Sequence, residues 1–169
     1  MKRYQGFSLV ELLIVIVVIA LISAIAIPNL LAARRAANQG AAVSSLRTLH
    51  GANVSYAATT GAGNYAGLAS TVGISSLNDL NAAGLIDGVL GSGEKSGFAY
   101  VGDRVAASAT EPQTFYFSAN PTITAGILMT GTRRYGIATD GVLHYDATTA
   151  DLATPFDAAT IAAALPLND

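Results

Sequence analysis

Hydrophobic residues are concentrated near the start of the chain. From Leu12 to Ile27 every side chain except that of Ser23 is apolar, and the preceding residues FSLVE extend the run back to Phe7. As a helix, residues 7–27 would span about 31 Å, close to the hydrocarbon thickness of a bilayer. A core helix of this length without a polar face is uncommon in a small domain. The pattern therefore predicts a membrane-spanning segment.

Two basic residues, Lys2 and Arg3, precede this run, as they would in a cleaved secretory signal. However, the run is longer than the usual apolar region of about 7–15 residues, and no small-x-small cleavage site follows it. We therefore expect the segment to stay attached. Arg34 and Arg35 after the run balance the two basic residues before it. The positive-inside rule therefore does not decide the orientation of the segment. The tendency of the first membrane segment to set the topology favours a cytoplasmic N-terminus.

The helical pattern continues beyond the apolar run. Pro28 predicts a kink or local unwinding, because it lacks an amide donor and clashes with the preceding turn. Strong helix formers then resume, and the helix is expected to end before Thr59, about 78 Å from its start. Gly40 and Gly51 each weaken it by about 1 kcal/mol relative to alanine. An amphipathic face recurs at three- and four-residue spacing: Val43, Leu46, Leu49, His50, Val54 and Ala57.

The pattern in the second half of the chain predicts a small sheet. Residues 61–102 hold ten of the 17 glycines and predict a loop-rich connection with a short helix over 76–83. Strand-like runs follow at 98–101, 114–119, 134–138 and 142–145. Asp140-Gly141 between the last two is a hairpin signal. We predict an α+β fold in which the long helix packs on an antiparallel sheet of about four strands.

Composition narrows the classes of function. The chain has 169 residues, 12% of them charged, with a formal net charge of −2 and no cysteine. This length fits about one domain, and the absence of a basic surplus argues against a nucleic-acid partner. Without cysteine there is no disulfide framework, thiolate metal site or cysteine nucleophile.

Glu11 places a carboxylate within the apolar run. An ionised group in hydrocarbon costs a few kcal/mol, so such residues are usually paired and functional. The segment itself holds no cation, so the partner would be a group of another chain or a newly exposed amine. The alternative is a carboxylate that lies near the lipid headgroups.

The stretch Gly6-Phe7-Ser8-Leu9-Val10-Glu11, with MKRYQ before it and an apolar run ending in Ile27-Pro28 after it, resembles the N-terminal signature of type IV pilins and pseudopilins. This resemblance covers residues 1–35. Residues 91–98 and 139–142 also resemble, less closely, elements of small bacterial pilins. It implies the pilin fold and cleavage by a prepilin peptidase between Gly6 and Phe7. The same enzyme would convert Phe7 to N-methylphenylalanine, and Glu11 would pair with the Phe7 amine of a neighbouring subunit.

The resemblance also implies a division of the chain and a set of partners. The expected segments are a cleaved leader (1–6), a transmembrane and assembly half-helix (7–28), an amphipathic half-helix (29–59), an αβ loop (60–97), the sheet (98–145) and an acidic C-terminal tail (146–169). The expected partners are other copies in a helical homopolymer, the peptidase and an inner-membrane assembly platform. The precursor would lie in the inner membrane and the product in an extracellular pilus or, alternatively, in a periplasmic pseudopilus.

The C-terminal tail departs from many pilins because it has no cysteine for a disulfide. Asp146, Asp151 and Asp157 are weak candidates for a calcium site like that of the major pseudopilin of type II secretion. Calcium needs about six or more oxygens, and no EF-hand pattern is present, so we expect a solvated acidic tail and no metal.

No catalytic constellation is evident. His50 and His144 have no paired acid at a known spacing, and there is no P-loop, H-E-x-x-H or G-x-S-x-G. We expect no catalytic residues and no cofactor, and hence not an enzyme. Three classes remain: a structural subunit of a type IV pilus, a pseudopilin of a type II secretion system, and a membrane-anchored periplasmic binding domain. The third requires the N-terminal signature to be a coincidence, whereas the first two stay open.

Overall fold

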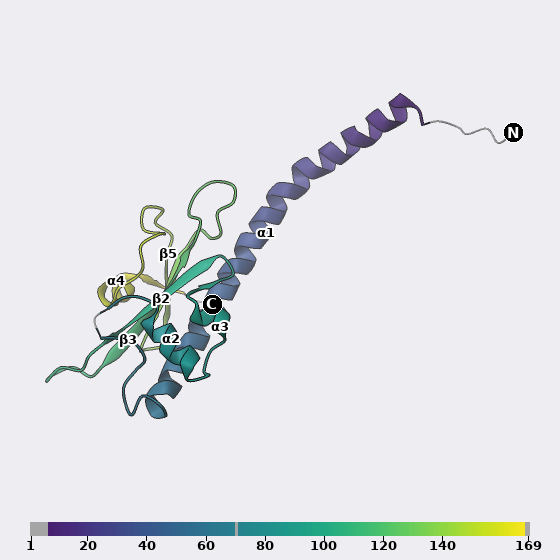
Figure 1. Cartoon of the computed structure of the whole chain (residues 1–169). Coiled ribbons are helices and arrows are strands. Elements are labelled where there is room, and N and C mark those ends of the chain that lie inside the picture. The colour runs from purple at the N-terminus through teal and green to yellow at the C-terminus, as the bar shows by residue number, and fades with distance from the viewer. Residues whose placement is uncertain (1–6, 70, 168–169) are drawn as a thin grey trace. The chain divides into compact units, whose positions relative to one another are not determined.

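A computed structural model describes residues 7–69 and 71–167. Helix α1 (Leu9–Ala58) is 50 residues long and continuous through Pro28 (Figure 1). The long predicted helix is therefore confirmed, and the structure shows no local unwinding at Pro28. A kink in the helix axis there stays a prediction.

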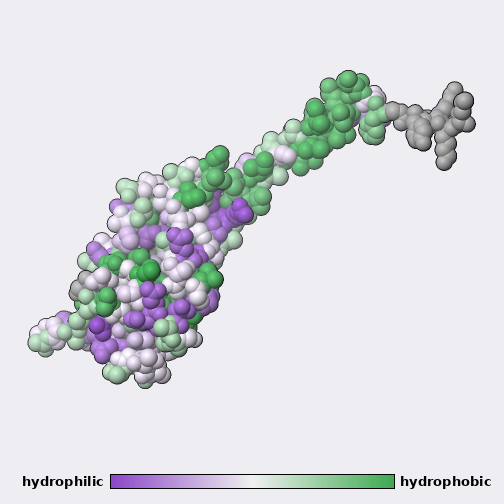
Figure 2. Space-filling model, viewed as in Figure 1, coloured by the Kyte–Doolittle hydropathy of each residue, from purple (hydrophilic) through white to green (hydrophobic). Residues whose placement is uncertain are grey.

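The chain divides into two units, residues 1–34 and residues 35–169. In the first unit, the part of α1 up to Ile27 carries large apolar side chains that are each about half exposed or more. Figure 2 shows this stretch as an almost uninterrupted hydrophobic surface. Among the described residues, α1 is the helix long and apolar enough to cross a membrane, and its most apolar window buries nothing within the chain.

The second unit contains a six-stranded antiparallel sheet in the order β1-β2-β3-β4-β5-β6. The α+β prediction is confirmed, but the expected number of about four strands is wrong. The two additional strands lie at the sheet edges and have only two residues each, too few to show an alternating pattern. The strands are β1 (Glu94–Lys95), β2 (Phe98–Val105), β3 (Thr114–Pro121), β4 (Arg134–Ala138), β5 (Leu143–Asp146) and β6 (Leu165–Pro166).

One main core joins α1 to the sheet. Leu46 and Leu49 of α1 are completely buried in the same cluster as Phe98, Tyr100 and Phe117 of β2 and β3. Helix α2 (Ser75–Ala82) adds further leucines to this core, and α3 (Gly88–Gly91) follows it. The amphipathic half of α1 thus packs on the sheet through the central part of the predicted face.

The end of that face differs from the sequence prediction. Val54 is exposed, and its neighbour Asn53 is completely buried instead. The side-chain oxygen of Asn53 accepts a hydrogen bond of 2.8 Å from the backbone N–H of Ala66. Burial of this amide anchors the loop after α1 on the helix, a long-range contact that helical periodicity does not reveal.

The C-terminal region is also more ordered than predicted. Instead of a solvated tail, it contains helix α4 (Ala158–Ala163), and β6 pairs with β5. Phe156 and Ile161 are buried with Tyr116 of β3 in a second hydrophobic cluster. A β-carbon on Gly136 of β4 would lie 2.9 Å from both Ile161 and Phe156, so these side chains pack directly against the strand. The segment therefore covers a face of the sheet.

Candidate functional site

The N-terminal segment is the first candidate site. Gly6 and the rest of the expected leader lie outside the described residues, so the structure shows only the Phe7 side of the expected cleavage site. Phe7 precedes the first turn of α1, and it is 83% exposed. An exposed, non-helical residue at this point is compatible with access by a membrane peptidase.

Ser8 and Glu11 close the N-terminus of α1. The Glu11 carboxylate accepts a hydrogen bond of 2.9 Å from the backbone N–H of Ser8. The Ser8 hydroxyl oxygen accepts a hydrogen bond of 3.3 Å from the backbone N–H of Val10. This reciprocal arrangement has the S-x-x-E spacing of a capping box, which satisfies amides that lack helical partners. We did not predict the cap, although the spacing of Ser8 and Glu11 in the sequence signals it.

The cap changes the electrostatic role expected of Glu11. Its negative charge lies at the helix end that carries the positive pole of the macrodipole, where an anion is stabilised. An ionised carboxylate can accept about four hydrogen bonds, so one bond to Ser8 leaves capacity for a cation. Glu11 can therefore act both as a cap within its own chain and as an acceptor for a partner.

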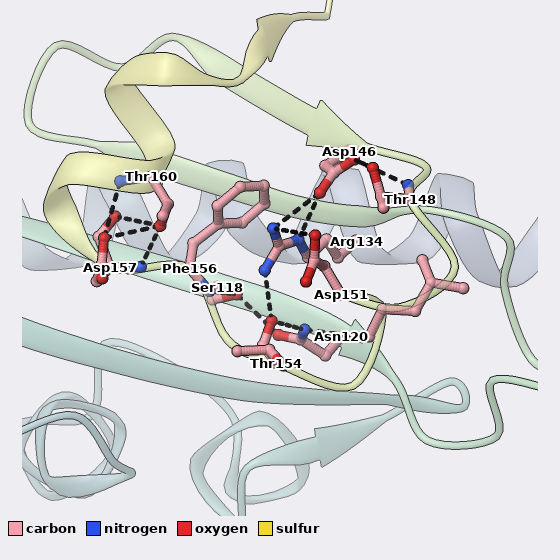
Figure 3. A network of polar contacts seen from close by, with 11 residues as sticks. Ser118, Asn120, Arg134, Asp146, Thr148, Asp151, Thr154, Phe156, Asp157 and Thr160 are labelled. Atoms are coloured by element: carbon pink, nitrogen blue, oxygen red, sulfur yellow. Dashed lines mark hydrogen bonds and ion pairs between the residues drawn. The ribbon is translucent and has the colours of Figure 1, made fainter.

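The three C-terminal aspartates have different local contacts: Asp151 lies 3.9 Å from a guanidinium nitrogen of Arg134, and the other two are held by hydrogen bonds (Figure 3). Asp146 accepts hydrogen bonds of 3.1 and 2.8 Å from the guanidinium of Arg134. Asp157 instead caps α4 by accepting a hydrogen bond from the backbone N–H of Thr160. No group of three or more histidine, aspartate or glutamate side chains suited to a metal occurs in the described ranges. The nearest charged partner of Asp146 is thus a cation of the same chain.

Hydrogen bonds lower the pKa values of Asp146 and Asp157. Donation from Thr148, and then from Arg134, holds the pKa of Asp146 below its usual value. Donation from Thr160 similarly lowers the pKa of Asp157. Both carboxylates therefore favour the ionised form in their local structural roles.

Arg134 is the centre of a polar network that holds the C-terminal segment (Figure 3). Besides pairing with Asp146, its guanidinium donates to the backbone oxygen of Thr154 at 2.8 Å and lies 4.2 Å from the ring centre of Phe156. Asn120 of β3 donates to the backbone oxygens of Leu152 and Thr154 at 2.9 and 2.8 Å. Side chains of two strands thus bind the C-terminal backbone in a chain that has no cysteine.

The two histidines have structural partners. His50 makes a 3.3 Å hydrogen bond to the backbone oxygen of Thr139, and His144 makes one of 3.0 Å to that of Ala164. The His50 ring also packs against Phe115, with 5.4 Å between ring centres. Each histidine therefore has a hydrogen-bond partner within the fold.

Comparison with known proteins finds similarity to a methylation motif and to a pilus component. A family model for the prokaryotic N-terminal methylation motif matches residues 1–27. A 38-residue region is 60% identical to the type IV wide pilus major component PilA4 of Thermus thermophilus. That match covers 22% of this chain and 29% of the relative. No solved structure matches the chain.

The family model matches the start of the chain, whereas the fold gives independent information about the rest. The long apolar helix packed through its second half on an antiparallel sheet is consistent with a pilin fold. The methylation motif, the pilus relative and this architecture together support the type IV pilin family for the chain.

Proposed function

We propose that this protein is a structural subunit that polymerises through α1 into a type IV pilus. The observation that carries the proposal is a methylation motif at the head of an apolar helix whose most apolar window buries nothing in its own chain. Exposed apolar surface of this length needs lipid or other helices around it. Pilin-family proteins are generally structural subunits, which supports a role without catalysis.

Maturation would begin in the inner membrane. In this proposal a prepilin peptidase removes residues 1–6 by cutting between Gly6 and Phe7, and then methylates the Phe7 amine. Loss of Lys2 and Arg3 changes the formal side-chain charge from 9 − 11 to 7 − 11, that is, from −2 to −4. Residues 7–28 then form the assembly half-helix, which an inner-membrane platform transfers from lipid into the filament and so to the cell exterior.

Assembly would pair Glu11 with the Phe7 amine of a neighbouring copy. A carboxylate and an ammonium that are each buried alone in an apolar bundle are costly, whereas a paired set offsets much of that cost. Because the charges lie at fixed positions near the end of α1, pairing also sets the axial register of adjacent subunits. The capacity that the Ser8 cap leaves on the carboxylate is what supports this role.

Processing and filament membership can be tested together. We expect filaments sheared from the cell surface to contain this chain as a main component, with Phe7 as a methylated N-terminus by mass spectrometry. Gly6→Val is expected to leave the leader attached, because the peptidase must admit the main chain at this position. An intact Met1 in filaments would contradict the processing step. Loss of secreted enzymes on deletion, with surface filaments intact, would indicate a secretion pseudopilin instead.

The role of Glu11 in assembly can be separated from its role as a cap. Glutamine also serves at this position of a capping box, so Glu11→Gln keeps an acceptor for Ser8 and removes the charge. We expect processed Glu11→Gln subunits to accumulate in the membrane, with a loss of most surface filaments by shearing and immunoblot. The matched control is Ser8→Ala, which removes one capping bond and keeps the charge, and should still assemble. Normal filaments with Glu11→Gln would contradict charge pairing.

A further inference from the structure

A tight turn at the tip of the loop between β3 and β4 exposes two large aliphatic side chains. The backbone N–H of Met129 donates to the oxygen of Gly126 at 3.4 Å, which places Ile127 and Leu128 at the two corners of a β-turn. Ile127 is 78% exposed and Leu128 is 68% exposed, and residues 122–132 carry no charge. Turn corners usually hold glycine, proline or small polar residues, so this pair indicates a contact outside the chain.

The loop is held on the face of the sheet that packs against α1. The Asn38 side chain of α1 donates to the Thr130 oxygen at 3.2 Å, and the Gln39 side chain donates to the Thr132 hydroxyl oxygen at 2.8 Å. Both helix residues belong to the second unit, so these contacts lie within one folded body. The base of the loop is thus fixed on this face, and the two aliphatic side chains at its tip stay exposed.

A groove opens on the opposite face of the sheet, beside α4. Tyr135 and Ile137 of β4 are buried in the core that α1 shares. Gly136 between them points to the other face, where a β-carbon on it would lie 2.9 Å from Phe156. Figure 3 is a view onto this second face, with α4 in front of the strands. The groove has a volume of about 670 Å³, and its lining includes Arg134, Asp146, Phe156, Thr160, Ala163 and Leu165.

The groove suits an uncharged apolar insert. Phe156 and Leu165 contribute apolar walls, and the volume lies within the range of about 300–1,000 Å³ that ligand pockets have. Two of its charged residues, Arg134 and Asp146, already bind each other, and the third, Arg133, lies over an aromatic ring of the same chain. An uncharged side chain that enters the groove therefore leaves these contacts in place, whereas a charged one would compete with them.

We propose that Ile127 and Leu128 of one copy insert into the groove beside α4 of a neighbouring copy. The inference rests on the proposed function, because it supplies a contact between the folded second units of polymerising subunits. The loop and the groove lie at the same end of the sheet, since the loop leads into Arg134 of β4, which pairs in register with Asp146 at the end of β5. Copies can therefore join face to back in one orientation. Such a heterologous contact leaves a tip and a groove free at the two ends of each assembly, as growth of a filament requires.

Cross-linking of the full chain in cells tests this contact, since the native sequence has no cysteine. Ala125→Cys places a thiol beside the tip and Ala147→Cys places one on the groove, and both positions are exposed. Cells express the two single variants together, so that any link between thiols joins two copies. A short bismaleimide is applied to sheared filaments, and dimers are separated on denaturing gels. The matched control replaces Ala147→Cys by Ala107→Cys, which is exposed between β2 and β3.

We expect covalent dimers from the mixture of Ala125→Cys and Ala147→Cys subunits, and about tenfold fewer from either variant alone or from the control mixture. Processed filaments without dimers from the mixture would overturn the inference and leave the proposed function standing. Dimers from Ala125→Cys alone would indicate a symmetric contact between two tips and also overturn it. Absence of the native chain from filaments would overturn the proposed function, and this contact with it.

Replacement of the tip side chains tests their contribution directly. We expect Ile127→Ser combined with Leu128→Ser to lower the yield of sheared filaments about tenfold, because the contact loses its apolar anchors. Unchanged melting of the purified subunit would show that the fold is intact. The matched control is Val89→Ser in α3, where the side chain is 58% exposed but lies outside the loop and the groove. Normal filament yield from the tip variant, or an equal loss from the control, would overturn the assignment to this loop.

Discussion

Two regions differ in how they bury apolar surface. They are the apolar half-helix, residues 7–28, and the folded head, residues 35–167. In the head, aromatic side chains such as Phe98 and Phe117 are completely buried against α1 and the sheet. In the half-helix, every large apolar side chain remains about half exposed or more. The head contains the partners for its own hydrophobic residues, whereas the half-helix requires partners from outside the chain.

The charged groups follow the same division. Arg134 in the head is 7% exposed, and it is engaged by a carboxylate, a backbone oxygen and an aromatic ring of its own chain. Glu11 in the half-helix is exposed and bonds to the backbone of Ser8. Groups that serve the fold are thus enclosed by it, and the group proposed to serve assembly is left accessible. The comparison favours the proposal that the half-helix makes the contacts between subunits.

Removal of residues 1–28 should have the largest effect on behaviour and little effect on the fold. We expect the shortened chain to stay in solution without detergent, because it lacks the exposed apolar run. None of the described residues in the deleted part is buried, so its melting temperature should stay within about 3 °C of that of the full chain, a change of less than about 1 kcal/mol. Circular dichroism and gel filtration would measure both properties.

The control for this deletion is the full chain in a mild detergent under otherwise identical conditions. A shortened chain that aggregates, or that loses its cooperative transition, would show that the half-helix supports the head. That result would break the distinction between the two regions.

Arg134→Met should cause the next largest effect, within the head. It leaves Asp146 without its cation and the Thr154 oxygen without this donor, so we expect destabilisation of about 2–4 kcal/mol. The matched control is Arg133→Met, since Arg133 is exposed and lies over the ring of Tyr145 at 4.8 Å, a contact worth about 0.5–1 kcal/mol. Urea unfolding would give both values. Equal losses for the two variants would contradict the central role of Arg134.

Much of the fold could be predicted because its main signals are local. Helix α1 follows from the length and composition of its sequence, and the Asp140-Gly141 turn follows from turn chemistry. Strand β4 lies where its strand pattern predicts it. The backbone of Gly141 has a φ of +75°, which explains why glycine suits that turn. Edge strands of two residues carry no comparable pattern. Local signals therefore predicted the central elements and not the full extent of the sheet.

The N-terminal motif and the network around Arg134 also differ in whether local sequence reveals them. Gly6, Phe7 and Glu11 could be proposed as site residues because a short contiguous motif carries them, and the family model matches the segment that contains them. The network around Arg134 joins β3 and β4 to residues 146–156 through contacts between distant parts of the chain. Alanine- and threonine-rich spacing between the aspartates gave no sign of this cation. The sequence therefore predicted a solvated tail, whereas the fold places Arg134 beside Asp146.

The smallest expected effect concerns the glycines of α1. A β-carbon at Gly51 would meet nothing within 4 Å, so Gly51→Ala should stabilise the subunit by about 0.5–1 kcal/mol through higher helix propensity. Gly102→Ala is the opposing control, because its β-carbon would collide with the buried ring of Phe117 and cost about 1–3 kcal/mol. Urea unfolding measures both. If Gly51→Ala is more stable as a subunit but forms fewer filaments, the glycine serves close helix contact or bending during assembly. Unchanged filaments would mean that assembly does not require glycine at position 51.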